Sequence, residues 1–174
     1  KFAPGSPSTF LNQDCCINVK ICILTVIGLL FLSTISKAQG FMMQKSESEW
    51  LRILGPEKYQ ILRKKGTEPP FSGTYTSHFQ PGRYKCAACS NVLFDYRQKF
   101  ESHCGWPSFD NECGDGNNIL KIKDRSHGMI RTEICCSKCG GHLGHVFDDG
   151  PTTGLRYCVN SLSIEFEPSE TQSK

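Results

Sequence analysis

The segment GLRYCVNS, residues 154–161, places a cysteine beside an arginine in a stretch that is typical of a β-strand. Side chains alternate along a strand, so Arg156, Cys158 and Asn160 share one face, and the apolar residues between them share the other. A permanent positive charge next to a thiol favours the thiolate, which is the reactive form. The pattern therefore predicts that Cys158 is a nucleophile; the alternative is an ordinary exposed cysteine at a strand end.

A second segment, GGHLGHVFDDG at residues 140–150, supplies groups that can move protons. The short turn GPTTG that follows predicts a hairpin, which would bring His142, His145 and Asp149 close to Cys158. By the same alternation, His145, Phe147 and Asp149 share a face. A thiol with an arginine, two imidazoles and a carboxylate is what a proton-coupled thiol reaction requires. Taken singly, each histidine could equally be a structural residue or a metal ligand.

Another cysteine lies in FESHCGWPSFD, residues 100–110, next to a tryptophan in a turn constrained by glycine and proline. If Cys104 can reach Cys158, the two thiols form an attacking and a resolving pair. Cys113, in the glycine-rich segment ECGDGNN, is an alternative resolving thiol. The spacing leaves both possibilities open.

Four further cysteines form two Cys-x-x-Cys pairs, Cys86 with Cys89 and Cys136 with Cys139. Each pair can aim two thiolates at one ion, and two pairs complete a tetrahedral site for zinc. A thioredoxin-like redox pair would be followed by a helix, whereas each pair here precedes a β-prone segment. Two disulfides are the other alternative. We expect one structural zinc with no open coordination position, and Cys135 is left out of it by the spacing.

Four motifs, in this order, resemble those of the type B methionine sulfoxide reductases: KGTEPPFSGTY, CGWPSF, HLGHVFDDGP and RYCVNS. The resemblance runs from about Trp50 to Glu167. It implies a mainly β (α+β) fold of two antiparallel β-sheets stapled by a four-cysteine zinc site, with short helices near the N-terminus. It also implies reduction of methionine-R-sulfoxide, free or in proteins, to methionine.

Roles follow from this resemblance position by position. Cys158 resembles the family's nucleophile, Cys104 resembles its resolving thiol, and Trp106 matches the ring that receives the substrate methyl group. The remaining matches bind and polarise the sulfoxide, and they are His142, His145, Asp149, Arg156 and Asn160, with Phe147 placed beside the substrate. Asp148 departs from the family pattern, in which many relatives carry proline. A thioredoxin-like dithiol is the implied reductant, acting on a monomer.

Two other functions remain open from the sequence. A zinc-stapled, non-catalytic ligand-binding module, similar to cereblon-type domains, would leave Cys158 structural. A cysteine hydrolase would use Cys158 with His145, but it would leave Cys104 without a role. The joint presence of Arg156 with Cys158 and of His142 with His145 favours the reductase, because a binding module has no need for these groups.

The elements that must position these residues are short. SESEWLRILGPEKYQILRKKG, residues 46–66, is typical of a helix broken at Gly55 and Pro56 and stopped by Gly66. TEPPFSG predicts an extended loop, because its two prolines fix φ and lack a donor. Short β-prone pieces follow, and the clearest is LRYCVNSLSIEFEP at residues 155–168. We expect one catalytic domain over residues 39–168 and a disordered tail over residues 169–174.

Charge and the N-terminal segment bear on partners and location. The formal net charge is +3 with no strongly basic cluster, which argues against nucleic-acid binding. Within residues 1–38, Lys20 and the apolar run ICILTVIGLLFL predict a signal peptide, or else an upstream extension. A true signal would place the protein in the secretory pathway, whereas translation from Met42 or Met43 would give a cytoplasmic protein. The apolar run is short for a membrane span.

Overall fold

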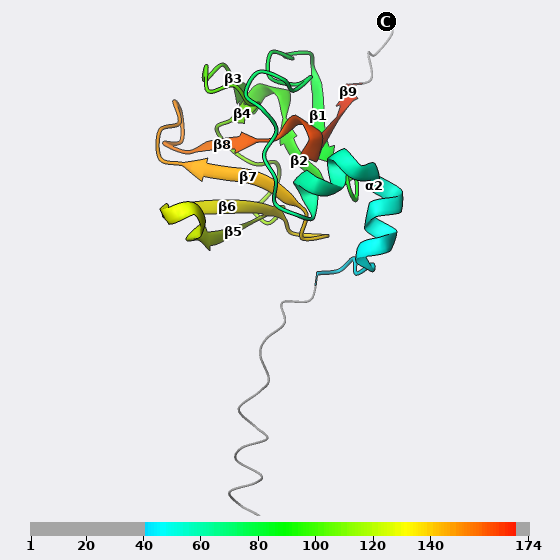
Figure 1. Ribbon diagram of the computed structural model, residues 1–174. Coiled ribbons are helices and arrows are strands. Elements are labelled where there is room, and N and C mark those ends of the chain that lie inside the picture. The colour runs from blue at the N-terminus through cyan, green and yellow to red at the C-terminus, as the bar shows by residue number, and fades with distance from the viewer. Residues whose placement is uncertain (1–40, 170–174) are drawn as a thin grey trace, which may run out of the picture. The chain divides into compact units, whose positions relative to one another are not determined.

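The computed structural model describes residues 41–169 (Figure 1). The predicted signal segment, and all of the predicted tail except Ser169, lie outside the described residues. Within residues 41–169, no helix combines the length and the apolar character needed to cross a lipid bilayer.

The one α-helix among the described residues, α2, covers Glu47–Leu62. Ser46 caps its first turn: the Ser46 hydroxyl accepts from the Glu49 backbone N–H, and the Glu49 carboxylate accepts from the Ser46 N–H at 2.9 Å. At Gly55 the backbone turns to φ 73° and ψ 169°, so two helical segments meet at the predicted break. The second segment ends at Leu62, before Gly66, which the sequence predicted as the stop.

Nine strands form two antiparallel sheets in the described part of the chain. The smaller sheet has the order β2-β1-β9, with β1 at Gly82–Cys86, β2 at Val92–Asp95 and β9 at Ile164–Pro168. The larger has the order β3-β4-β8-β7-β6-β5, and its strands are β3 (Lys99–Phe100), β4 (Ser108–Phe109), β5 (Ile119–Asp124), β6 (Arg131–Cys136), β7 (His142–Phe147) and β8 (Arg156–Val159). Short 3-10 turns complete the chain: η2 (Tyr96–Gln98), η3 (Ser126–Gly128) and η4 (Ser161–Ser163). The predicted fold of two antiparallel sheets is confirmed.

The clearest predicted strand, residues 155–168, is not one strand. It divides into β8 in the larger sheet and β9 in the smaller sheet, with η4 between them. The reason is the buried carboxylate of Glu68, which accepts from the backbone N–H groups of Ser161 at 2.6 Å and Leu162 at 3.0 Å. Those donors are therefore satisfied by a side chain instead of a neighbouring strand, and the chain turns there.

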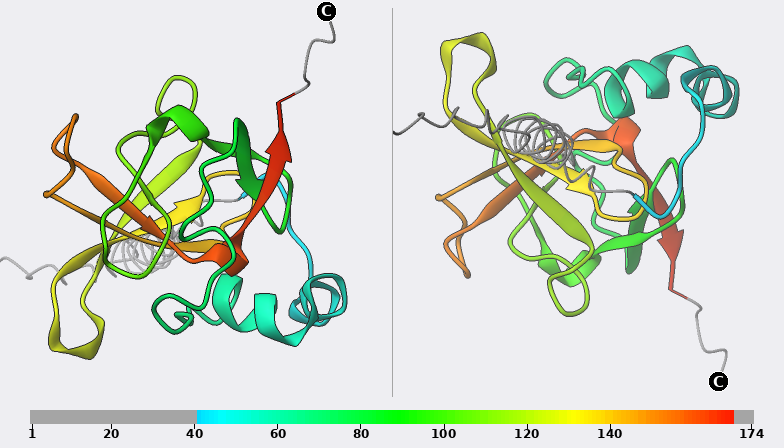
Figure 2. Two further views of the ribbon diagram at one scale, coloured as in Figure 1. Left: turned by 90° about the horizontal axis from the view of Figure 1, so that it is seen from above. Right: turned by 90° about the horizontal axis from the view of Figure 1, so that it is seen from below.

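The core lies where the two sheets meet and is rich in aromatic side chains. Phe94 stacks on Phe109 with ring centroids 4.1 Å apart, and Tyr84 meets Phe109 edge to face at 5.0 Å. On β8, Tyr157 and Val159 are buried in this core, as the alternation predicts. Helix α2 packs beside η4 and β7. Both views of Figure 2 show it at one edge of the fold, outside the strands. One face of β8 therefore packs in the core, and the opposite face, which carries Arg156 and Cys158, is turned away from it.

Candidate active site and cysteine cluster

Strands β7 and β8 form the predicted hairpin, and their register places the candidate residues opposite one another. His145 is the cross-strand partner of Cys158, and Phe147 is the partner of Arg156. Directly opposite residues lie on the same face of a sheet, so all four side chains share the face turned away from the core. The hairpin therefore brings a thiol, an imidazole, a guanidinium and an aromatic ring together.

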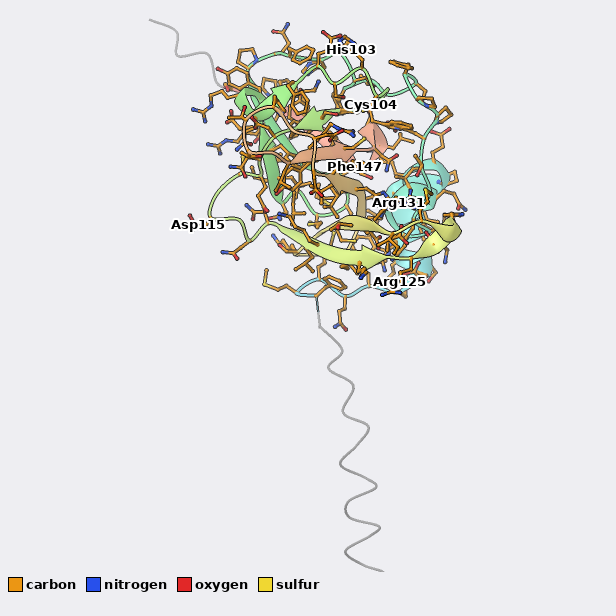
Figure 3. All side chains as sticks on the ribbon, turned by 90° about the vertical axis from the view of Figure 1, so that its left-hand side faces the viewer. His103, Cys104, Asp115, Arg125, Arg131 and Phe147 are labelled. Atoms are coloured by element: carbon orange, nitrogen blue, oxygen red, sulfur yellow. The ribbon has the colours of Figure 1, made fainter. Side chains whose placement is uncertain are left out.

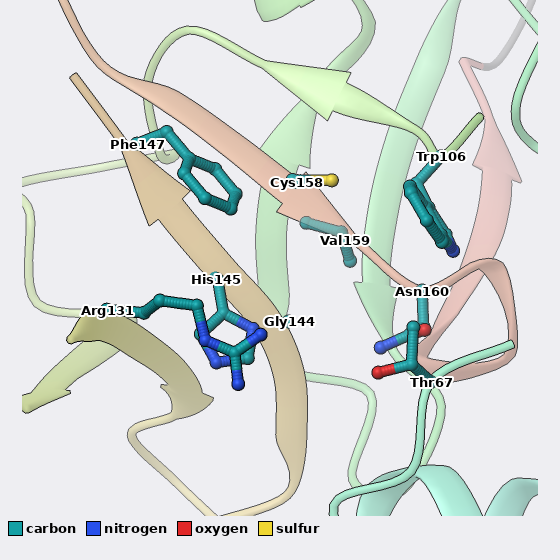
Figure 4. Close-up of a pocket in the computed structure, with 9 residues that line it drawn as sticks. All are labelled: Thr67, Trp106, Arg131, Gly144, His145, Phe147, Cys158, Val159 and Asn160. Carbon is teal, nitrogen blue, oxygen red and sulfur yellow. The ribbon is translucent and has the colours of Figure 1, made fainter. Parts of the chain in front are cut away.

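Cys158 borders a pocket of about 120 Å³ (Figure 4). The residues that line it are Thr67, Trp106, Arg131, Gly144, His145, Phe147, Cys158, Val159 and Asn160. In Figure 4 the sulfur of Cys158 points toward the side of Trp106, while Phe147 and His145 lie on the opposite side. Four of these lining residues, Thr67, Arg131, Gly144 and Val159, were not predicted from the sequence.

A β-bulge explains why both histidines face the same region. His145 follows His142 by three positions, so in a regular strand their side chains would point to opposite faces. The pairing of β6 with β7 skips Leu143, and this irregularity re-aims His142. The two imidazole rings lie 5.7 Å apart. Gly144, at φ 154°, allows this geometry, because a Cβ there would collide with the carbonyl oxygen of Cys158.

Cys104 is the thiol that the structure places next to Cys158. Their Sγ atoms are 3.7 Å apart, because β4 pairs Ser108 with Cys158 and the turn before β4 folds back over that strand. A disulfide needs about 2.05 Å, so a short approach of the turn would join them. Cys113 instead lies near Gln98, with its Sγ 3.8 Å from the Gln98 side-chain oxygen. Of the two candidate resolving thiols, Cys104 is therefore the one placed to form a disulfide with Cys158.

The two neighbouring thiols share a proton in a way that the sequence did not predict. The hydrogen bond with Cys104 and then burial raise the pKa of Cys158, and Arg156 lowers it to a smaller extent. The same bond, with help from the hydroxyls of Ser102 and Ser108, lowers the pKa of Cys104 to about 4. In this arrangement the hydrogen bond favours the negative charge on Cys104, while Arg156 acts in the expected direction by lowering the pKa of Cys158.

Arg156 is paired with Asp149 on the same side of the hairpin. Its guanidinium donates two hydrogen bonds of 2.9 Å to the carboxylate of Asp149 and lies over the ring of Phe147, 4.5 Å from the centroid. This pairing lowers the pKa of Asp149 and offsets the positive charge next to Cys158. Arg156 and Asp149 thus lie beside the pocket as a pair and are not among the residues that line it.

The opposite wall of the pocket depends on Glu68. The indole N–H of Trp106 donates to the Glu68 backbone oxygen at 3.1 Å, and the Glu68 N–H donates to the Asn160 side-chain oxygen at 3.1 Å. The Asn160 amide also donates to the Leu143 carbonyl at 3.1 Å. The loop before β1 therefore fixes both the indole and the amide that border the reactive sulfur.

Each histidine is held by a carboxylate from β5 or β6. His145 Nε2 lies 2.9 Å from Asp124 Oδ2, and the same oxygen accepts from Arg131 at 2.8 Å. His142 Nδ1 lies 2.8 Å from Glu133 Oε1, and its Nε2 is buried with no partner among the described residues. His142 does not line the pocket; it lines a second hollow directly beside it, which also includes His145 and Arg131. Neither carboxylate was predicted, because no motif links them to the histidines.

If the chain carries out the sulfoxide reduction that its motifs imply, we expect Asp124→Asn to slow methionine formation about tenfold to a hundredfold, because His145 loses the carboxylate that orients it. Burial lowers the pKa of His145, and the hydrogen bond to Asp124 raises it. Losing that bond lowers the pKa further, so protonated His145 appears only at lower pH. The measurement is the pH profile of single-turnover methionine formation, with Asp115→Asn, an exposed carboxylate in the 111–118 loop, as the control. An unchanged profile in Asp124→Asn would show that Asp124 does not act through His145.

The four predicted metal-binding cysteines meet at one point, at the turns after β1 and β6. Their Sγ atoms all lie within 4.8 Å of one another. Cys86 and Cys139 are 3.7 Å apart, and Cys89 and Cys136 are 3.6 Å apart. Four sulfurs at 2.3 Å from a tetrahedral ion are separated by about 3.8 Å, so the cluster can hold a metal ion. The Asn91 amide lies 3.7 Å from the Cys136 sulfur and can support it.

Comparison with known proteins agrees with this site. Residues 54–168 match the SelR domain. The peptide methionine sulfoxide reductase MsrB of Leptospira interrogans is 56% identical over 129 residues, which cover 74% of this chain and 98% of that protein. The proteins of the same name from Bradyrhizobium diazoefficiens and Pseudomonas putida are 54% and 52% identical, covering 71% and 74% of this chain and 89% and 98% of theirs. The similarity covers every residue of the pocket and of the cysteine cluster.

Proposed function

The chain belongs to the SelR domain family, and on this premise we propose that it reduces methionine-R-sulfoxide to methionine. The coarser statement, that it is a methionine sulfoxide reductase, follows from relatives of that name at more than 50% identity over most of both chains. The observation that carries the finer proposal is the thiol of Cys158, 3.7 Å from a second thiol, bordering a pocket between an indole and an imidazole.

The first step needs the proton that the two thiols share. Its transfer from Cys158 to Cys104 gives the Cys158 thiolate while the charge of the pair stays the same. The thiolate attacks the sulfoxide sulfur, and the sulfoxide oxygen takes a proton with His145 as the nearest acid. Methionine leaves, and the oxygen remains on Cys158 as a sulfenic acid.

The second step returns the enzyme to its starting state. The Cys104 thiol attacks the sulfenic sulfur, water leaves, and a disulfide joins the two residues. A dithiol reductant such as thioredoxin then reduces that disulfide by exchange. The distance of 3.7 Å between the two sulfurs supports this route. A disulfide bond is about 2.05 Å long, so the turn that carries Cys104 has only a short distance to move.

We attribute selectivity for the R epimer to the two different walls of the pocket. Trp106 offers an apolar face for the methyl group, while His145 and Asn160 offer polar groups for the oxygen. The S epimer would place its oxygen against the indole, where it would lose its hydrogen bonds at a cost of about 1–3 kcal/mol.

We also propose that the metal of the four-cysteine cluster is zinc. Four thiolates with no open position suit a structural zinc, which would join the turn after β1 to the turn after β6. The ion would take no part in the reaction, since no substrate could reach it.

The test of the proposed function is an epimer-resolved assay with dithiothreitol as reductant, in which methionine formation is measured separately from R- and S-sulfoxide. We expect turnover of the R epimer and at least about a tenfold to hundredfold preference for it, as the lost hydrogen bonds imply. Preference for the S epimer would contradict the proposal. No turnover of either epimer by the zinc-loaded protein would contradict it more broadly.

Cys104→Ser should separate the two steps. We expect this variant to release about one methionine per enzyme in a single turnover and then to stop when thioredoxin is the reductant, because the sulfenic acid has no resolving partner. The measurement is methionine formed per enzyme in the first turnover and at steady state. Sustained thioredoxin-driven turnover in Cys104→Ser would show that another thiol resolves the intermediate, and a Cys104→Ser/Cys113→Ser double variant would then identify Cys113.

A further inference from the structure

A second hollow, of about 330 Å³, lies directly beside the reactive pocket and shares Thr67, Arg131 and His145 with it. We propose that this groove binds a carboxylate of the substrate, supplied by an acidic side chain near the oxidised methionine in a polypeptide. The inference rests on the proposed function and specifies its substrate class. The groove is lined by Lys64, Lys65, Thr67, Asp124, Ser126, His127, Arg131, Glu133, His142 and His145.

The two carboxylates of the groove are already saturated. Asp124 Oδ1 accepts from the Ser126 backbone N–H at 2.9 Å, and its Oδ2 accepts from Arg131 and is bonded to His145. Glu133 Oε1 is bonded to His142, and its Oε2 accepts from Lys65 at 2.8 Å. Both acids therefore have each oxygen engaged and offer little to a further cation.

The cations of the groove, by contrast, have donors to spare. Lys65 carries three N–H donors and uses one of them on Glu133, and Arg131 carries five. The Nε–H of Arg131 is buried and has no acceptor among the described residues. A buried donor without an acceptor costs free energy, and a carboxylate that accepted from this Nε–H would lower that cost.

The groove also presents its positive charges outward. The Lys65 side chain is 64% exposed, whereas the Glu133 side chain beneath it is 5% exposed. Lys64 is half exposed at the same rim. In Figure 3, Arg131 and Arg125 lie on the same side of the fold as Phe147 and Cys104, so these two cations and the reactive site can face one approaching chain.

The spacing fits a polypeptide substrate. Two strand intervals separate β8, which carries Cys158, from β6, which carries Arg131, and each interval is about 4.8 Å. An extended peptide advances about 3.3 Å per residue, so a glutamate two residues from the methionine sulfoxide could reach the groove with its own side chain. The α-carboxylate of free methionine sulfoxide is the other source of the same chemistry.

The test uses capped and amidated peptides with methionine-R-sulfoxide and either Glu or Gln two residues before or after it. We expect kcat/KM to be about threefold to tenfold higher for Glu than for Gln at one of these positions, and the preference should shrink as salt is added. In Lys65→Gln the Glu/Gln ratio should fall toward one. Because the ratio compares two peptides on one enzyme, a general loss of activity cancels.

Lys123→Gln is the matched control. Lys123 is exposed on the same hairpin as Arg131, but it points to the opposite face of β5 from Asp124, so the variant loses the same charge away from the groove. We expect it to keep the Glu/Gln ratio of the unmodified protein. An equal fall in both variants would mean that net charge alone sets the preference, and it would overturn the proposed subsite.

Further outcomes separate this inference from the proposed function. Equal kcat/KM for all Glu and Gln peptides would overturn the subsite and leave the reductase intact. If no peptide is reduced, the proposed function fails, and binding of the same peptides to Cys158→Ser then decides the subsite by its Glu/Gln ratio. Preference for N-acetyl-methionine-R-sulfoxide over its amide, lost in Lys65→Gln, would assign the groove to the α-carboxylate and overturn the acidic side chain.

Discussion

Cys158→Ser should reduce methionine formation from the R-sulfoxide by at least about a thousandfold, because removing a nucleophile leaves only binding and polarisation. A hydroxyl in this pocket stays protonated and cannot accept the sulfoxide oxygen through a sulfenic acid. The side chain is half-buried and lies opposite His145 on the outer face of β8, so serine should not disturb the core. The measurement is methionine formed with dithiothreitol, which needs no resolving thiol.

Cys113→Ser is the matched control for this variant. Cys113 is also partly buried and free, but its sulfur lies near Gln98 and outside the pocket. We expect its turnover with dithiothreitol to stay within about twofold of the unmodified protein. Full activity in Cys158→Ser, or an equal loss in both variants, would remove Cys158 from the role of nucleophile.

The part of the site that could be predicted from the sequence is local. Arg156, Cys158 and the hairpin partner His145 follow from strand alternation and one short turn, and β7 and β8 have that register. The two Cys-x-x-Cys pairs are equally local, because each pair needs only its own turn. Motif spacing therefore recovers those residues whose neighbours are close in the chain.

Other features depend on pairings between distant segments. Asp124 reaches His145 because β5, β6 and β7 pair in a particular register, and the bulge at Leu143 sets where His142 points. The balance of charge between the two thiols depends on distant partners in the same way. Alternation placed Arg156 beside Cys158, but it could not show that Asp149 occupies the guanidinium or that Cys104 shares the proton. Strand alternation was enough to predict which residues share a face. The charge on each group could not be predicted without knowing which residues it contacts in the folded structure.

The second large effect concerns the four-cysteine cluster, where we expect Cys136→Ser to abolish the folded domain at 37 °C. A structural zinc bound by thiolates contributes about 10–16 kcal/mol in small zinc-binding peptides, which is comparable to the whole stability of a typical domain. Cys136 ends β6, and Cys86 ends β1, so the ion would tie the larger sheet to the smaller one. Loss of one cysteine ligand would therefore weaken the attachment of the two sheets to each other.

The measurement is thermal unfolding followed by circular dichroism, with zinc per chain determined by elemental analysis. Cys135→Ser is the matched control, because Cys135 adjoins Cys136 and is also buried but lies outside the cluster of four. We expect one zinc per chain and a melting temperature within a few degrees of the unmodified protein for Cys135→Ser, whereas Cys136→Ser and chelator-treated protein should unfold. A stable, zinc-free protein with Cys86 bonded to Cys139 and Cys89 bonded to Cys136 would replace the zinc site by two disulfides. The mutual approach of all four sulfurs argues against that pairing, because two separate disulfides would not need to share one centre.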